Sequence, residues 1–149
     1  MKEKFSNELS EKSTEIVTWK AQYCTGIDLI DEQHMELVNL TNKLYQACLD
    51  GKENVGIAFK EAMSRMVKYV RFHFGAEEKL LEQMKYPQYL EHKNQHKILV
   101  QNILDAVKDY ESGKNFVPNH FVRTLTDWVF GHIAIKDRIY AEYFSGQKK

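Results

Sequence analysis

Both prolines of the chain, Pro87 and Pro118, fall between long segments in which apolar residues recur every three or four positions. Proline disrupts a helix interior because it lacks the backbone N–H and clashes with the preceding turn. Its confinement to these two boundaries leaves every periodic segment free to form an unbroken helix. The chain has no alternating valine-rich runs of the kind that indicate β-strands. An all-α fold is therefore predicted.

The periodic segments predict four helices. The first begins near Asp31 and ends near residues 50–51, and the second covers about 54–84. The third begins around Pro87 and ends at residues 112–113, and the fourth begins near Pro118. Short connections between long helices favour antiparallel neighbours, hence an up-and-down antiparallel four-helix bundle. The expected inward residues are Leu37, Leu40, Leu44 and Cys48; Phe59, Met63, Met66 and Val70; Leu99, Ile103, Ala106 and Tyr110; and Phe121, Leu125, Trp128 and Ile139.

The segment before the first helix divides into two parts. Residues 1–14 are polar and aperiodic, which predicts a flexible tail. Residues 15–30 are predicted to form an N-terminal arm, in which Ile16, Trp19 and Ile27 are available to pack over one end of the bundle. The bundle itself would occupy residues 31–145, with no internal repeat and no second domain.

Composition narrows the classes of function. Acidic and basic side chains balance at 21 each, so neither nucleic acid nor an anionic membrane is an expected partner. No segment approaches the roughly 20 apolar residues that span a bilayer, and the start lacks the apolar core of a secretory signal. Cys24 and Cys48 are too few for a disulfide framework and are expected to be free thiols. A cytoplasmic protein is expected.

Histidines occupy the inward stripes of all four predicted helices. His34 shares a stripe with Leu37, and His73 and Glu77 lie four residues apart on the stripe of Val70. The same stripes carry His92, His96 and His132 on the last two helices. Buried imidazoles and a buried carboxylate without partners would cost several kcal/mol each. A metal ion bound by all of them removes that cost, and facing helices of a bundle are where such sites form.

Taken singly, these residues have ordinary interpretations. A lone H-x-x-x-H pair such as His92 and His96 is usually a pair of surface residues that binds no metal, and Glu77 beside Glu78 could be a solvated pair. The joint placement on inward stripes is what indicates a metal site. His120 lies about 120° round the last helix from His132 and is expected to be a surface residue.

Four motifs surround these residues in order along the chain. They are Trp19 with Gly26-Ile27-Asp28 and Asp31-Glu32-Gln33-His34; His73-Phe74-x-x-Glu77-Glu78; His92-x-x-x-His96; and His132-Ile133-x-x-x-Asp137. Together they resemble the hemerythrin family, in particular its bacterial type (bacteriohemerythrin), over roughly residues 17–144. Every ligand position of the family pattern holds the expected residue type.

The resemblance implies two iron ions bridged by an oxo or hydroxo group. His92, His96 and His132 would hold one iron, and His34 and His73 the other. Glu77 and Asp137 would bridge the pair. Residues five apart, such as His132 and Asp137, point about 140° from one another on a regular α-helix. The last helix is therefore expected to loosen locally, or its two ligands to approach the metals from different sides.

The ligand set favours reversible dioxygen binding over oxidation of a substrate. Two six-coordinate irons held in this way would keep one position open, on the iron with two histidines, as a gas ligand requires. Oxygen-activating di-iron bundles use carboxylate-rich sites with two Glu-x-x-His motifs, and neither Glu77 nor Glu78 begins one here. An oxygen-binding protein for storage, delivery or sensing is predicted, rather than an enzyme. A di-iron enzyme, a handler of nitric oxide or peroxide, and an iron- or oxygen-responsive regulatory module with a protein partner are the alternatives.

Four apolar residues next to the ligands are candidates for the wall of a dry dioxygen pocket, although each could be ordinary core: Leu37, Phe74, Trp128 and Ile133. Two tyrosines at helical spacing from ligands, Tyr69 and Tyr140, are candidates for hydrogen bonds to them.

Overall fold

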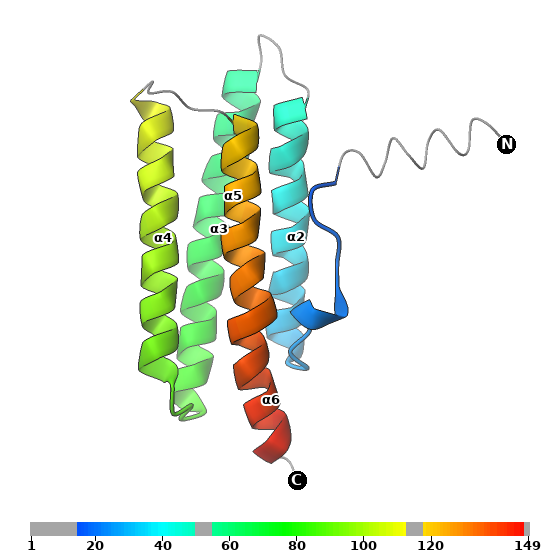
Figure 1. Ribbon diagram of the computed structural model, residues 1–149, viewed down its shortest axis with the longest axis vertical. Helices are drawn as coiled ribbons and strands as arrows, with labels where there is room; N and C mark the ends of the chain where they lie inside the picture. Colours follow the sequence, from blue (N-terminus) through cyan, green and yellow to red (C-terminus); the bar gives the residue numbers. More distant parts are fainter. Residues whose placement is uncertain (1–14, 50–54, 113–117, 148–149) are drawn as a thin grey trace, which may run out of the picture.

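The computed structural model describes residues 15–49, 55–112 and 118–147, and within them four long helices lie side by side (Figure 1). Successive long helices run in opposite directions, so the predicted all-α, up-and-down bundle is confirmed. The predicted tail, residues 1–14, lies outside the described residues. The elements are the 3-10 helix η1 (Ala21–Tyr23), α2 (Asp28–Leu49), α3 (Val55–Gln83), α4 (Tyr89–Glu111), α5 (Pro118–His132), the π-helical turn η2 (Ile133–Asp137) and α6 (Arg138–Gln147).

The predicted apolar stripes meet in one main core. α3 contributes its whole predicted stripe, and Leu37 and Leu44 of α2 are fully buried. On α4 only Ile103 of the predicted four is fully buried, whereas Leu99 and Ala106 pack against the core from its edge. The core therefore lies mainly between α2, α3 and α5. No helix among the described residues is both long enough and apolar enough to cross a membrane.

The arm lies along the flank of α2 rather than over a bundle end (Figure 1). The Asn42 side chain fixes it, because its Oδ1 accepts the backbone N–H groups of Ile16 and Val17, and its Nδ2 donates to the Val17 carbonyl. Val17 and Tyr23 are the buried anchors, whereas Trp19 is 37% exposed. Ile16 and Ile27, the other two arm residues expected to pack, are partly buried.

The first helix begins at Asp28, three residues earlier than predicted, so the end of the predicted arm is helical. The cause is local: the Asp31 carboxylate accepts hydrogen bonds from the backbone N–H groups of Thr25 and Gly26, at 2.6 and 3.1 Å. Gly26 has φ 82°, a conformation that suits glycine. These contacts fix the entry to α2 directly before the residues that carry His34.

The connection between α3 and α4 closes one end of the bundle. Lys85 has φ 56°, the Tyr86 N–H donates to the Leu81 carbonyl and the Lys85 N–H donates to the Glu82 carbonyl, which is the pattern of a Schellman C-cap. Because this turn extends beyond Pro87, α4 begins at Tyr89 and not at the proline. Tyr86 and Leu81 pack with Tyr140 and Phe144 in a second buried cluster.

The last helix is interrupted by the π-helical turn η2. A π-turn accommodates one residue more than an α-turn, so the buried stripe moves one position along the chain. Ile139, which was predicted to face inward, is 45% exposed, and the neighbouring Tyr140 is fully buried instead. The local loosening expected between His132 and Asp137 is confirmed.

Candidate metal centre

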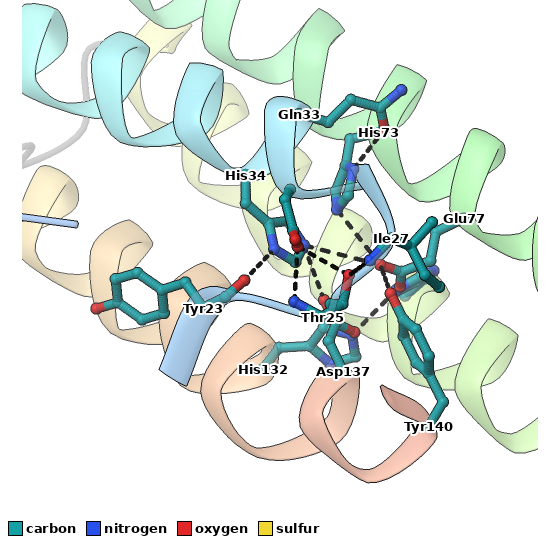
Figure 2. A network of polar contacts seen from close by, with 12 residues as sticks. Tyr23, Thr25, Ile27, Gln33, His34, His73, Glu77, His132, Asp137 and Tyr140 are labelled. Carbon is teal, nitrogen blue, oxygen red and sulfur yellow. Dashed lines mark hydrogen bonds and ion pairs between the residues drawn. The ribbon is translucent and has the colours of Figure 1, made fainter. Parts of the chain in front are cut away.

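Seven polar side chains from every long helix and from η2 converge inside the bundle. Figure 2 labels His34, His73, Glu77, His132 and Asp137 among them. All are buried, and four of them, His34, His73, Glu77 and Asp137, are completely inaccessible to solvent. The seven are His34 of α2, His73 and Glu77 of α3, His92 and His96 of α4, His132 of α5 and Asp137 of η2, which is the complete predicted ligand set. The remaining histidine, His120, is exposed, as predicted.

Two groups of ligand atoms form within this cluster, and each group is compact enough to surround one ion. In each group the atoms lie within 4.8 Å of one another. One group contains three histidines and the other contains two, while Glu77 and Asp137 belong to both. The three-histidine group is His92, His96 and His132, and the two-histidine group is His34 and His73. The division matches the predicted assignment of ligands to two metals.

Glu77 divides its two carboxylate oxygens between the groups. Oε1 lies 2.8 Å from His92 Nε2 and 3.1 Å from His96 Nε2. Oε2 lies 3.5 Å from His73 Nε2 and 3.9 Å from His34 Nε2. One oxygen thus faces the three-histidine group and the other faces the two-histidine group, which is the arrangement of a bridging carboxylate.

Asp137 is divided in the same way. Its Oδ1 lies 3.1 Å from His92 Nε2 and 3.2 Å from His132 Nε2, and its Oδ2 lies 3.2 Å from His34 Nε2. The π-turn makes this possible, since it brings Asp137 round to the face of the helix that carries His132. Both carboxylates therefore span the same two groups.

The outer nitrogens of three histidines are held by acceptors. His34 Nδ1 donates to the Tyr23 carbonyl at 2.7 Å, and His73 Nδ1 lies 2.7 Å from Gln33 Oε1. His96 Nδ1 lies 3.0 Å from Glu78 Oε2. Donation from Nδ1 leaves the Nε2 lone pair directed inward, as a metal ligand needs, and fixes the ring orientation. These three partners were not assigned from the sequence.

Tyr140 is the predicted tyrosine that reaches the cluster. Its hydroxyl donates to Glu77 Oε2 at 3.0 Å, and burial together with the Glu77 charge raises the pKa of Tyr140 well above its usual value, so it stays protonated. Tyr69 is half-buried and its ring lies against Phe72. Tyr140 therefore orients a carboxylate of the site.

Several buried atoms of the cluster need a cation. His34 Nε2, His73 Nε2 and both Asp137 carboxylate oxygens make no hydrogen bond of acceptable geometry. The Nε2 atoms of His96 and His132 lie 3.0 Å apart. Because the proton of His96 is on Nδ1 and is donated to Glu78, the Nε2 lone pair of His96 faces His132. Unsatisfied buried polar atoms are rare and costly. Metal ions between these atoms would satisfy all of them, so the residues fit the centre that the resemblance implies.

The electrostatics of the cluster point the same way. Burial acts to raise the pKa of Glu77, but the neighbouring imidazoles of His34, His92 and His96 outweigh it and hold the pKa well below the usual value. For the basic His34, burial acts in the opposite direction and lowers the pKa, but contacts with Asp137 and Glu77 raise it to about 10. For His73, burial dominates and lowers the pKa to about 4. Burial and the Glu77 charge act to raise the pKa of Asp137, but its contacts with His132, His34 and His92 outweigh them and lower it, so both buried carboxylates stay ionised.

The predicted pocket residues differ in their relation to the cluster. Phe74 is buried and its ring stacks on His96 with centroids 3.9 Å apart. Leu37 and Ile133 are also buried, at 0% and 1% exposure. Trp128 is half-buried and packs against the main core. Phe74 thus lies directly against a candidate ligand, whereas Leu37 and Ile133 belong to the main core and Trp128 packs against it.

Comparison with known proteins agrees with this geometry. The family model described as the hemerythrin HHE cation binding domain matches residues 25–144. The chain is 31% identical over 126 residues to a bacteriohemerythrin of Pseudomonas aeruginosa (strain LESB58), covering 85% of this chain and 80% of that protein. It is 27% identical over 132 residues to a bacteriohemerythrin of Methylococcus capsulatus, covering 87% and 98%.

A solved structure is similar as well. A crystal structure of wild-type hemerythrin superposes with a TM-score of 0.78 at 26% sequence identity, covering 85% of this chain and 96% of that one. The family match extends from the loop before α2 into α6 and includes all seven converging side chains. This chain belongs to the hemerythrin family.

Proposed function

We propose that this protein binds dioxygen reversibly at a non-heme di-iron centre and serves oxygen storage, delivery or sensing. The observation that carries the proposal is the division of Glu77 and Asp137 between a three-histidine and a two-histidine group. Histidine-rich sites with carboxylate oxygens suit iron. The names of the relatives, bacteriohemerythrins, support the same function.

The residues would hold the irons unequally. His92, His96 and His132 would bind one iron, His34 and His73 would bind the other, and the two carboxylates would bridge them, with an oxo or hydroxo group as the third bridge. When bound, the iron pair supplies the electrons and the open coordination position that dioxygen binding requires. The two-histidine group offers fewer ligands, so we assign the open position to that side.

The surrounding side chains would keep the ligand geometry fixed and exclude water. Tyr140 and the Nδ1 partners of His34, His73 and His96 orient the ligating atoms. The apolar shell of Leu37, Phe74, Trp128 and Ile133 would limit the access of water and protons, which promote irreversible oxidation of the centre. In this proposal the protein supplies a dry, rigid cavity and no side-chain acid for a reaction.

A cycle of reduction and oxygenation tests the proposal. The iron-loaded protein is reduced without air, exposed to dioxygen and then returned to an inert atmosphere, while the visible spectrum is followed. We expect a new absorption band that appears with dioxygen and disappears when dioxygen is removed. A single irreversible conversion to the ferric spectrum, or turnover of an added substrate or peroxide, would contradict reversible binding and favour a di-iron enzyme.

A further inference from the structure

Beside the metal centre, α3 and α4 enclose an open groove of about 500 Å³. Phe74, Leu90 and Val100 give it an apolar wall, and His96 also lines it. The Phe74 and His96 rings are almost parallel, at an interplanar angle of 2°. The volume lies within the range of small-molecule sites. Phe74 and His96 are almost completely buried, at 2% and 1% exposure, so their stacked rings form the floor of the groove and separate it from the proposed centre.

The charged residues of the groove are mostly cationic. Arg71, Lys93 and Lys97 line it, and the carboxylate in the lining, Glu78, is already engaged by His96 Nδ1 at 3.0 Å. None of the three cations forms an ion pair with a carboxylate in the described part of the chain. Lys93 Nζ lies over the Tyr89 ring, 5.9 Å from its centroid, which leaves its charge uncompensated. Cations without a carboxylate partner beside an apolar wall are complementary to an anion with a hydrophobic body.

Gly75 keeps the groove open on the α3 side. It lies inside the helix and lines the groove, and a Cβ added there would meet no heavy atom within 4 Å. Glycine within a helix costs about 0.5–1 kcal/mol relative to alanine, and no close backbone contact here requires it. A methyl group at this position would displace no neighbour, and a longer side chain would extend into the space of the groove.

We propose that this groove is a binding site for a small organic anion with a flat aromatic body. The ring would lie against Phe74 and the apolar wall, and the acidic group would meet Lys93, Lys97 and Arg71. The site is separate from the dioxygen position and does not depend on the proposed oxygen function. A ligand bound here would cover Glu78, the partner of His96 Nδ1.

Isothermal titration calorimetry of the iron-loaded protein with 2-naphthoate tests the site, with the neutral isostere 2-naphthamide as the matched ligand. We expect 2-naphthoate to bind and 2-naphthamide to bind at least about tenfold more weakly, because a charge-assisted contact contributes at least that factor. Equal binding of the two ligands, or no binding of 2-naphthoate, overturns the proposal.

Variants then locate the bound anion. Gly75→Leu is expected to abolish 2-naphthoate binding by filling the groove, whereas Gly75→Ala is expected to retain it. Lys93→Gln/Lys97→Gln is expected to weaken binding at least about tenfold. The control Lys68→Gln/Lys79→Gln removes the same charge from exposed positions of α3 outside the groove and is expected to bind like the natural protein.

Undiminished binding by Gly75→Leu and by the Lys93/Lys97 variant would place the anion elsewhere, for example on iron, and overturn the proposal. The lysine variants keep the test decisive if Gly75→Leu fails to fold.

Discussion

His132 and Asp137 are five residues apart in the chain, yet His132 Nε2 lies 3.2 Å from Asp137 Oδ1. The π-helical turn between them provides this proximity, which a regular α-helix would not. Asp137 is thereby placed where its second oxygen, Oδ2, faces His34 on the opposite side of the cluster. The bridging position of Asp137 depends on the local backbone as much as on the residue type.

Replacement of the Asp137 carboxylate by an amide tests this bridge. Asp137→Asn keeps the side-chain shape but loses the charge and one oxygen ligand, so we expect the protein to retain fewer irons per chain than the natural protein. Asp127→Asn, at an exposed position of α5, is the matched control and is expected to retain a full complement. Elemental analysis after equal dialysis measures both. Equal iron content in both variants would contradict a bridging role.

Glu78 is expected to strengthen iron binding through His96. A carboxylate that accepts the Nδ1 proton of a ligating histidine raises its basicity, and loss of such a partner typically weakens metal affinity about 10–100-fold. We expect Glu78→Ala to lower iron affinity by a factor in that range and Glu78→Gln, which can still accept the proton, to lower it less. Iron release to a competing chelator measures the order, with Glu61→Gln on the exposed face of α3 as the control. Unchanged release from Glu78→Ala would show that the contact at 3.0 Å contributes nothing to binding.

Substitution of Trp128 tests whether the proposed apolar shell excludes water from the centre. Trp128→Ala leaves every ligand in place, so we expect normal iron uptake but faster spontaneous oxidation of the oxygenated protein, because water gains access. The loss of stability is expected to be smaller than the roughly 3–5 kcal/mol typical of a fully buried aromatic, since Trp128 is half-buried. Trp19→Ala, at a residue that is 37% exposed in the arm, is the control. The oxidation rate of each variant is measured by following its visible spectrum over hours. Equal rates in both variants would show that Trp128 contributes only to core packing.

The Asp31 carboxylate is expected to make the stability of the fold depend on pH. Burial acts to raise its pKa, but hydrogen bonds from Thr25, Cys24 and Gly26 outweigh it, and the pKa is lowered from 3.8. A carboxyl whose folded pKa is depressed stabilises the fold above its unfolded pKa and loses that contribution as the pH falls through the folded value. Asp31→Asn is therefore expected to lower the melting temperature at neutral pH by an amount that shrinks below about pH 4. A difference that is constant down to pH 3 would show that the charge of Asp31 contributes nothing.

Much of the site could be predicted from the sequence because helical periodicity places buried side chains on one stripe. His34, His73 and Glu77 follow α-helical spacing relative to apolar neighbours, and all three are buried where that spacing puts them. Asp137 does not follow it, and only the family resemblance pointed to this residue. The same irregularity explains the error at Ile139: a stripe extended at α-helical spacing misses the residue that the π-turn adds, and Tyr140 takes the buried place.

The contacts that orient the ligands could not be predicted in this way. His34 Nδ1 is held by the backbone carbonyl of Tyr23, whose position depends on how the arm is fixed by Asn42. Because every residue has a backbone carbonyl, the sequence does not indicate which carbonyl a histidine will meet. Gln33 and Glu78 adjoin ligands in the chain, but which ring nitrogen each one meets depends on the rotation of neighbouring helices about their axes. Tertiary packing decides these contacts.

The proposed function requires a two-iron centre that binds one dioxygen and releases it. The most direct test is a titration of the anaerobically reduced, iron-loaded protein with dioxygen, in which oxygen uptake is measured against iron content and the gas is then removed. We predict that the protein takes up one dioxygen for every two irons and returns the same amount under inert gas, through at least several cycles. Uptake that is not recovered on removal of dioxygen, or a stoichiometry of one iron per chain, would contradict reversible binding at a two-iron centre.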